Sequence, residues 1–202
     1  MKLPEPRTTG DLSVEQAISQ RSSTRTYARG ALSLAEVAQL LWAAQGETRE
    51  GGYRSTPSAG ALYPLELYLV AYEVKGLPAG VYRYVSAGHA LEEHGGIGQR
   101  GQLAASALDQ ACVRNAPAVI VFSGVYARTM QKYGQRAVRY VHMEVGHAAQ
   151  NVYLQATTLG LVAHQMAGFD VKKARELFHV PESFEPVVMM VLGYWGEGRN
   201  LD

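Results

Sequence analysis

The segment RSSTR at residues 21–25 combines cations with hydroxyl groups. Arg21 and Arg25 stand four residues apart, with Ser22 and Ser23 between them. Two guanidinium groups supply positive charge and paired donors, and the hydroxyls add further donors, so the segment can wrap a phosphate dianion. A solvent-exposed basic turn has the same composition, and a motif this short more often forms such a turn than a binding site. The segment therefore indicates a phosphate site only if other features support it.

A second segment, TPSAGALYP at residues 56–64, offers backbone rather than charge. Ser58, Ala59 and Gly60 are small, and Pro57 and Pro64 flank them. A flat ligand can lie against backbone N–H and C=O groups where side chains are this short. The competing interpretation is a tight turn at the entry to a strand, fixed by the two prolines.

A third segment, HQMAGFD at residues 164–170, repeats the pattern of small residues after a strand. Met166, Ala167 and Gly168 would expose backbone at the end of that strand. An ordinary turn explains the same residues. The segment adds to a binding hypothesis but does not carry one.

Other chemistries find no support in the sequence. His142 and His147 are five residues apart, about 140° around a helix of ~3.6 residues per turn, whereas zinc-binding helices place histidines four apart. With Glu144 they are better read as polar contacts between helices, and we expect no metal. Cys112 has no evident histidine partner and is predicted to be a core thiol. Dinucleotide, phosphate-loop and serine-hydrolase motifs are missing.

Composition sets the class of protein. The 202 residues are 47% hydrophobic and 18% charged, with a net charge of +1 and one cysteine. These values fit one globular domain over residues 1–202 in a reducing compartment, so we expect a cytoplasmic location. A net charge of +1 does not indicate a basic surface for nucleic acid. No apolar run approaches the ~20 residues that cross a membrane.

The longest predicted element is a helix over residues 139–160. Apolar residues recur there at steps of three, four and seven, and Gly160 fits the left-handed position after a helix end. The helix carries only two charges, Arg139 and Glu144. We therefore expect it to be covered almost all round, by the rest of the domain or by a second subunit, which raises the prospect of an obligate homodimer.

The other predicted elements mix helices and strands without a regular βαβ rhythm, which favours an α+β fold. Helices are expected over 13–21 and 33–46, each with a capping box, and over 99–112 and 172–179. Strands are expected over 65–74, 80–85, 90–95, 118–122, 161–168 and 186–195, with a long irregular loop over 47–60 and a polar segment over 126–137.

The order of these motifs resembles one protein family. An R-S-S-x-R loop after the first helix, a P-S-x-G segment after the second and a glycine turn after a long helix look like the FMN-dependent nitroreductase superfamily. The segments LLWAAQG, TPSAGALYPLELYLV, GVYRY and EVGHAAQNVYLQATTLGL resemble its SagB-type dehydrogenase branch. The resemblance runs from about Ser19 to Trp195.

The resemblance implies a nitroreductase-like α+β fold, in which helices surround a mixed, mostly antiparallel sheet with a long central helix. It also implies an interlocked homodimer with two FMN sites at the subunit interface. Three groups of residues would bind the cofactor: Arg21, Ser22, Ser23 and Arg25 the phosphate and ribityl chain; Pro57, Ser58, Ala59 and Gly60 the isoalloxazine ring, from the partner subunit; and Met166, Ala167 and Gly168 the flavin N5 edge.

Catalysis is also suggested by resemblance. Azoline-oxidising members carry a Lys-Tyr pair before the central helix, and Lys132 and Tyr133 occupy that place here. A lysine beside a flavin can lose its proton and a tyrosine can relay one, although an exposed polar loop has the same residues. Two departures stand out. Arg199 is the only tail cation that could contact phosphate, and the extra sequence of peptide-acting azoline oxidases is missing.

Three functions follow as hypotheses. The chain could dehydrogenate an azoline or similar small-molecule or peptide-derived heterocycle, passing hydride to FMN. It could instead take hydride from NAD(P)H and reduce nitroaromatics, quinones or flavins. A non-enzymatic alternative is a protein that holds flavin without turnover, or a subunit that needs a partner. The Lys-Tyr pair favours the first hypothesis and the short, single-domain chain favours the second.

Overall fold

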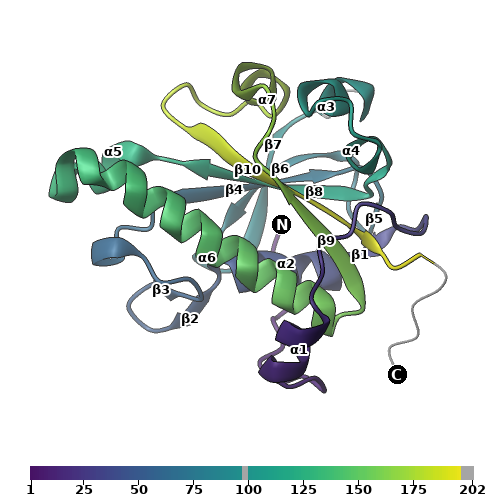
Figure 1. Cartoon of the computed structure of the whole chain (residues 1–202). Coiled ribbons are helices and arrows are strands. Elements are labelled where there is room, and N and C mark those ends of the chain that lie inside the picture. The colour runs from purple at the N-terminus through teal and green to yellow at the C-terminus, as the bar shows by residue number, and fades with distance from the viewer. Residues whose placement is uncertain (97–99, 197–202) are drawn as a thin grey trace.

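A six-stranded antiparallel sheet forms the centre of the computed structural model, which describes residues 1–96 and 100–196 (Figure 1). Its strands run in the order β7-β6-β4-β8-β10-β9. Their bounds are Leu65–Ala71 for β4, Gly80–Val85 for β6, Ala90–Gly95 for β7, Ala118–Gly124 for β8, Leu161–Met166 for β9 and Glu185–Tyr194 for β10. Two small pairs flank the sheet: β1 Leu32–Ser33 runs parallel to β5 Val74–Lys75, and β2 Glu47–Arg49 runs antiparallel to β3 Tyr53–Arg54.

Alternation along the central strands divides their side chains between two cores. Successive strand residues point to opposite faces, so Phe122 of β8 and its neighbour Val121 are buried in different clusters. The register pairs Phe122 with Leu67 on β4, in the same cluster, and pairs Val121 with Tyr68, in the other. Both faces of the sheet are therefore apolar, and helices must cover both.

Helices cover the two faces unequally (Figure 1). One face packs on α2 Leu34–Gln45 and α6 Ala137–Thr158, and α1 Val14–Gln20 lies against α6. The other face packs on α3 Arg100–Ser106, α4 Ala111–Asn115 and α7 Val171–Leu177. The α5 helix, Tyr126–Tyr133, meets the N-terminal end of α6. The predicted α+β class is confirmed.

Local signals placed the helix ends correctly. Ser13 and Ser33 each complete a capping box with the residue three positions on, as expected. Gly160 has a φ of 68° just after α6, the left-handed conformation that glycine adopts without strain. Gly46 ends α2 in extended backbone instead of the left-handed conformation. The residue is a glycine because a side chain there would collide with Trp42.

Two expectations about local structure were wrong. The loop over 47–60 contains the β2–β3 hairpin. The single helix over 99–112 divides into α3 and α4, because Leu108 and Asp109 both have positive φ and break the helical path. The polar segment over 126–137, for which the sequence predicted no element, is largely helical, as α5 and a following 3₁₀ turn, Gly134–Arg136.

The long helix α6 is buried on one side only. Val141, Val145 and Val152 enter the core, whereas Met143 is 53% exposed and His147 is also exposed. The rest of the domain therefore does not provide the second cover that the low charge of this helix predicted. Among the described residues, no helix is long and apolar enough to cross a membrane.

Candidate active site

The RSSTR segment runs beside β9, at the C-terminal end of α6. Ser23 forms a parallel bridge with Ala163, and Thr24 N–H donates to the Ala163 carbonyl at 3.3 Å. The Tyr153 hydroxyl of α6 lies 3.1 Å from Ser23 Oγ and accepts from the Gln165 N–H at 2.8 Å. The Arg21 guanidinium lies over the Tyr153 ring, 5.2 Å from its centroid. Tyr153 thus joins the segment to both α6 and β9.

Arg25 is held by a histidine that the sequence reasoning did not single out. Its Nε donates to His164 Nε2 at 3.1 Å, which requires that nitrogen to be unprotonated. Burial, and next the nearby Arg25 charge, lower the pKa of His164, so the ring stays neutral at neutral pH and can accept. His164 is 6% exposed and Arg25 is exposed, so the guanidinium remains open to a ligand.

The strand that carries His164 also brings the third predicted segment to this place. Met166 ends β9 and is buried, whereas Ala167 and Gly168 follow it and are exposed. The structure therefore places the RSSTR segment beside β9 and the Met166–Gly168 segment at the end of the same strand. We refer to these two segments together as the cationic cluster.

The Pro57–Gly60 segment forms a tight turn with unusual backbone. Gly60 has a φ of 65°, and Ala61 and Tyr63 also have positive φ, at 55° and 44°. Non-glycine residues in this region carry of order 1–3 kcal/mol of strain each, and such positions gather at functional sites. Ser58 Oγ accepts from the Tyr63 N–H at 2.9 Å, and Ala61 N–H donates to the Ser58 carbonyl at 3.0 Å. Ser58 therefore fixes the turn.

Lys132 and Tyr133 converge on this turn from the end of α5. A methyl group built on Gly60 would lie 2.9 Å from the Tyr133 hydroxyl and 3.1 Å from Lys132 Nζ. The Tyr133 ring packs edge to face on Tyr140 of α6, with centroids 5.0 Å apart. The structure thus brings the predicted Lys-Tyr pair to the predicted ring-binding segment. We call Lys132, Tyr133 and the Pro57–Gly60 turn together the Lys-Tyr cluster.

Glu144 of α6 lies behind the same turn. Its side chain is 2% exposed, and burial raises its pKa to about 7, with Ser58, Arg54 and Gln45 acting in the opposite direction. Sequence reasoning took Glu144 for a polar contact between helices. The signal that could have identified it is a lone acid within the apolar repeat of a long helix.

The two clusters stand apart within one chain. Tyr153 anchors the cationic cluster and Tyr140 the Lys-Tyr cluster, about 20 Å apart along α6 at ~1.5 Å per residue. A cavity of about 250 Å³ adjoins the Lys-Tyr cluster, lined by Pro57, Ser58, Ala59, Tyr140, Met143, Glu144 and His147. The remaining predicted cofactor contact, Arg199, lies outside the described residues.

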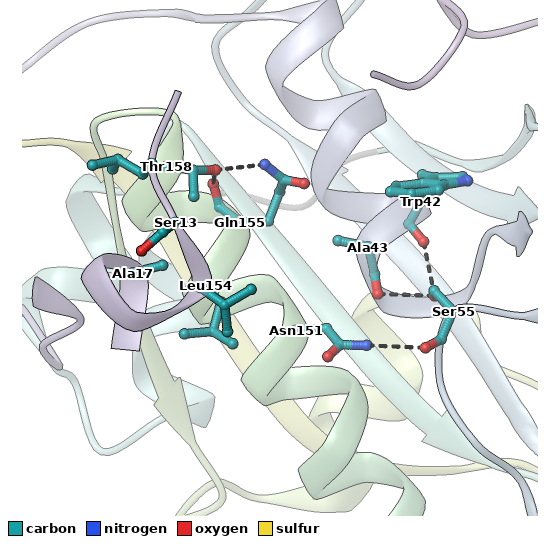
Figure 2. A pocket seen from close by; sticks show the side chains of 11 residues that line it. Ser13, Ala17, Trp42, Ala43, Ser55, Asn151, Leu154, Gln155 and Thr158 are labelled. Carbon is teal, nitrogen blue, oxygen red and sulfur yellow. Dashed lines mark hydrogen bonds between the residues drawn. The ribbon is translucent and has the colours of Figure 1, made fainter. Parts of the chain in front are cut away.

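A second cavity of about 250 Å³ lies between α1, α2 and α6, away from the predicted site residues (Figure 2). Ser55 Oγ closes one side by donating to the carbonyls of Trp42 and Ala43, each at 2.9 Å. Asn151 Nδ2 donates to the Ser55 carbonyl at 3.4 Å. These bonds tie the segment before Pro57 to both α2 and α6.

Comparison with known proteins identifies the fold. Residues 18–194 match the model of the nitroreductase family. The chain belongs to the nitroreductase family. A Methanocaldococcus jannaschii protein classed as a nitroreductase is 41% identical over 187 residues, which is 91% of each chain. The predicted nitroreductase-like fold is thereby confirmed, and with it membership of an oxidoreductase family that generally uses FMN.

A more distant relative is named for the processing of microcin B17. The Escherichia coli microcin B17-processing protein McbC is 27% identical over 169 residues, covering 80% of this chain and 62% of that one. Among solved structures, a Ralstonia eutropha protein also classed as a nitroreductase superposes with a TM-score of 0.84 at 27% identity, covering 98% of this chain and 90% of the other. A chain of the E. coli microcin synthetase complex superposes with a TM-score of 0.76, covering 96% and 77%, and at 24% identity shows the fold alone.

Proposed function

We propose that this chain is an FMN-dependent oxidoreductase of the SagB type that works as a homodimer. Each site would combine the cationic cluster of one subunit with the Lys-Tyr cluster of the other. Two observations support this arrangement. The clusters lie at opposite ends of α6, and the uncovered side of α6 presents Val138 and Met143, which are 37% and 53% exposed. A second copy of the chain would cover that side.

The residues present fit the cofactor. Arg21 and Arg25, with the hydroxyls of Ser22 and Ser23, supply charged and neutral donors suited to a phosphate. Gly60, whose missing side chain leaves backbone open beside Lys132, and the exposed Ala167 and Gly168 suit a flat ring. When bound, FMN would supply hydride transfer at N5.

The observation that carries the proposal is the approach of Lys132 and Tyr133 to Gly60. Dehydrogenation of an azoline-like ring removes one hydride and one proton and leaves a new double bond. Lys132 in its neutral form would take that proton, and the Tyr133 hydroxyl would relay it or hold the substrate. The relative named for microcin B17 processing supports a peptide-derived heterocycle as the substrate.

A second function is favoured by a different observation. The M. jannaschii relative matches this chain over 91% of both lengths and is classed as a nitroreductase. Reduction of nitroaromatics or quinones with hydride from NAD(P)H would use the same FMN site. In that reaction Lys132 and Tyr133 would matter less, because the electron donor brings its own hydride.

Anaerobic absorbance spectroscopy separates these functions. A yellow protein that NADH or NADPH bleaches supports the reductase. One that ignores both nucleotides but is bleached by a thiazoline or oxazoline supports the dehydrogenase. A colourless protein that does not bind added FMN contradicts both.

Two variants test the role of the Lys-Tyr cluster. Lys132→Ala and Tyr133→Phe are expected to retain FMN and to lower dehydrogenation about 100-fold or more, the usual contribution of a positioned acid or base. Lys172→Ala, an exposed lysine of α7, is the matched control and should turn over at the wild-type rate. Unchanged turnover in both variants would remove the proposed catalytic role.

A further inference from the structure

Gly146 lies in the middle of α6, where a glycine is costly. It is exposed, and a methyl group built on its backbone would meet no described atom within 4 Å. A glycine inside a helix is less stable than an alanine by about 1 kcal/mol, because its unfolded backbone has more freedom to lose. Glycine is favoured where another backbone comes close. The residue therefore indicates that a second segment packs against α6 at this point.

The exposed side of α6 has the spacing of a helix-packing seam. Its residues Arg139, Met143, Gly146 and Gln150 are exposed and follow one another at steps of four, three and four. This spacing places them on one stripe of the helix. Figure 1 shows α6 crossing the molecule between α5, which meets its first turns, and α1, which lies against its last. A single facing helix would cover the stripe, with its closest approach at Gly146.

The first turns of α6 carry a positively charged patch. We define the basic patch as four exposed residues: Arg136, Val138, Arg139 and Met143. Neither arginine forms an ion pair with another described residue. The patch therefore offers two free cations beside two apolar side chains.

A patch of the opposite charge lies at the other end of α6. We define the acidic patch as four exposed residues in α1 and just before it: Asp11, Val14, Glu15 and Ile18. Val14 and Ile18 are 66% and 57% exposed, and neither acid has an ion-pair partner in the described part of the chain. Val14 lines the cavity of Figure 2 together with Leu154, which places the patch beside the last turns of α6. The two patches are complementary in charge and alike in apolar content.

We propose that two copies of the chain pair about a two-fold axis that passes α6 at Gly146, with the basic patch of each copy on the acidic patch of the other. The proposal rests on the proposed function, because the second copy is the one that completes each site. Residues at equal distances before and after the axis face each other across the two antiparallel helices. Tyr140 lies six residues before Gly146 and Tyr153 seven residues after it. The same axis therefore brings the Lys-Tyr cluster of each copy to the cationic cluster of the other.

A parallel pairing of the two helices is disfavoured by the same residues. It would set basic patch against basic patch and acidic patch against acidic patch, and like charges in contact cost free energy. It would also leave each cationic cluster at the end of α6 away from both Lys-Tyr clusters. The antiparallel pairing avoids both problems.

The first test places a side chain on the axis. Gly146→Leu favours the helix of a single chain but sets two leucines against each other in the pair. We expect the dimer dissociation constant, measured by analytical ultracentrifugation, to rise about 100-fold or more. FMN affinity, measured by fluorescence quenching, should fall with it. Lys172→Leu, which adds the same side chain to an exposed position of α7, is the matched control and should remain a dimer.

A second variant uses the same position without breaking the pair. Because a residue on a two-fold axis lies beside its own copy, Gly146→Cys should form a disulfide-linked dimer under mild oxidation. Lys172→Cys should not. The native Cys112 is buried and is common to both variants.

Charge reversal tests the two patches. The double variant Arg136→Glu with Arg139→Glu should weaken the dimer about 10-fold or more, and Asp11→Arg with Glu15→Arg should do the same. Combining all four substitutions should restore the wild-type dissociation constant to within a few-fold, because opposite charges then face each other again.

The outcomes separate the interface from the proposed function. A wild type that sediments as a monomer at every concentration refutes the pairing, as does a Gly146→Leu variant that dimerises normally or a Gly146→Cys variant that does not cross-link. Failure of the four combined substitutions to restore the dimer refutes the facing of the two patches. A wild type that behaves as predicted in all these measurements but binds no FMN confirms the pairing and contradicts the proposed function.

Discussion

The buried carboxyl of Glu144 predicts an unusual dependence of stability on pH. Its pKa in the folded chain is about 7, above the 4.5 of an ordinary glutamate. Between these values the folded chain binds more protons than the unfolded chain. The free energy of unfolding must therefore fall as pH rises from about 4.5 to about 7, and this contribution is constant outside that interval.

The size of the effect follows from the same two values. The difference of about 2.5 pKa units, at ~1.36 kcal/mol per unit, corresponds to about 3 kcal/mol. Solvent screens this charge little, because Glu144 is 2% exposed. Glu144→Gln keeps the shape of the side chain and removes the charge. As pH rises from about 4.5 to about 7, the wild type should lose about 3 kcal/mol in its free energy of unfolding, and the variant should not lose it.

Urea unfolding of the flavin-free protein, followed by circular dichroism at several pH values, measures this difference. Glu50→Gln, an exposed acid in the β2–β3 hairpin, is the matched control and should follow the wild type throughout. Parallel curves for Glu144→Gln and the wild type would show that Glu144 carries no raised pKa.

Two further predictions concern the two clusters separately. Replacing His164 with Phe removes the acceptor of Arg25, and we expect FMN affinity measured by fluorescence quenching to fall about 10-fold, whereas His164→Gln, which retains an acceptor oxygen, should lose less. Gly60→Ala should lower the free energy of unfolding in urea by more than Gly88→Ala. Both glycines have positive φ, but a methyl group at Gly60 meets the Tyr133 hydroxyl while Gly88 faces open space, so equal losses of ~1 kcal/mol would show that the contact with Tyr133 carries no energy.

Several features of the fold could be predicted from the sequence because their causes are local. Ser13 and Ser33 satisfy the first amides of their own helices, and Gly160 relieves the strain of its own backbone. The continuous apolar segment AVIVF predicts a buried strand whatever lies beside it. The break at Leu108 and Asp109 has no glycine or proline to mark it, so the division of the 99–112 helix was not predictable.

The sequence predicted the segments that form the candidate site, but it did not predict which of them lie close together. RSSTR and MAG indicate binding by their residue types alone, and their proximity follows from the pairing of Ser23 with Ala163 across 140 residues of sequence. Lys132 and Tyr133 were identified by resemblance, and their approach to Gly60 depends on the docking of α5 against α6. No local pattern specifies such a contact.

What the sequence determined by itself is the family, the elements and the small set of residues with chemistry to offer. The tertiary structure decided which of them meet, and it decided their charge. Glu144 is an ordinary acid in the sequence and has a pKa of about 7 in the fold, because α2, β3 and the Pro57–Gly60 turn exclude water from its carboxyl. His164 is kept neutral in the same way and becomes the acceptor for Arg25. Desolvation depends on neighbours distant in sequence, and only the folded chain supplies them.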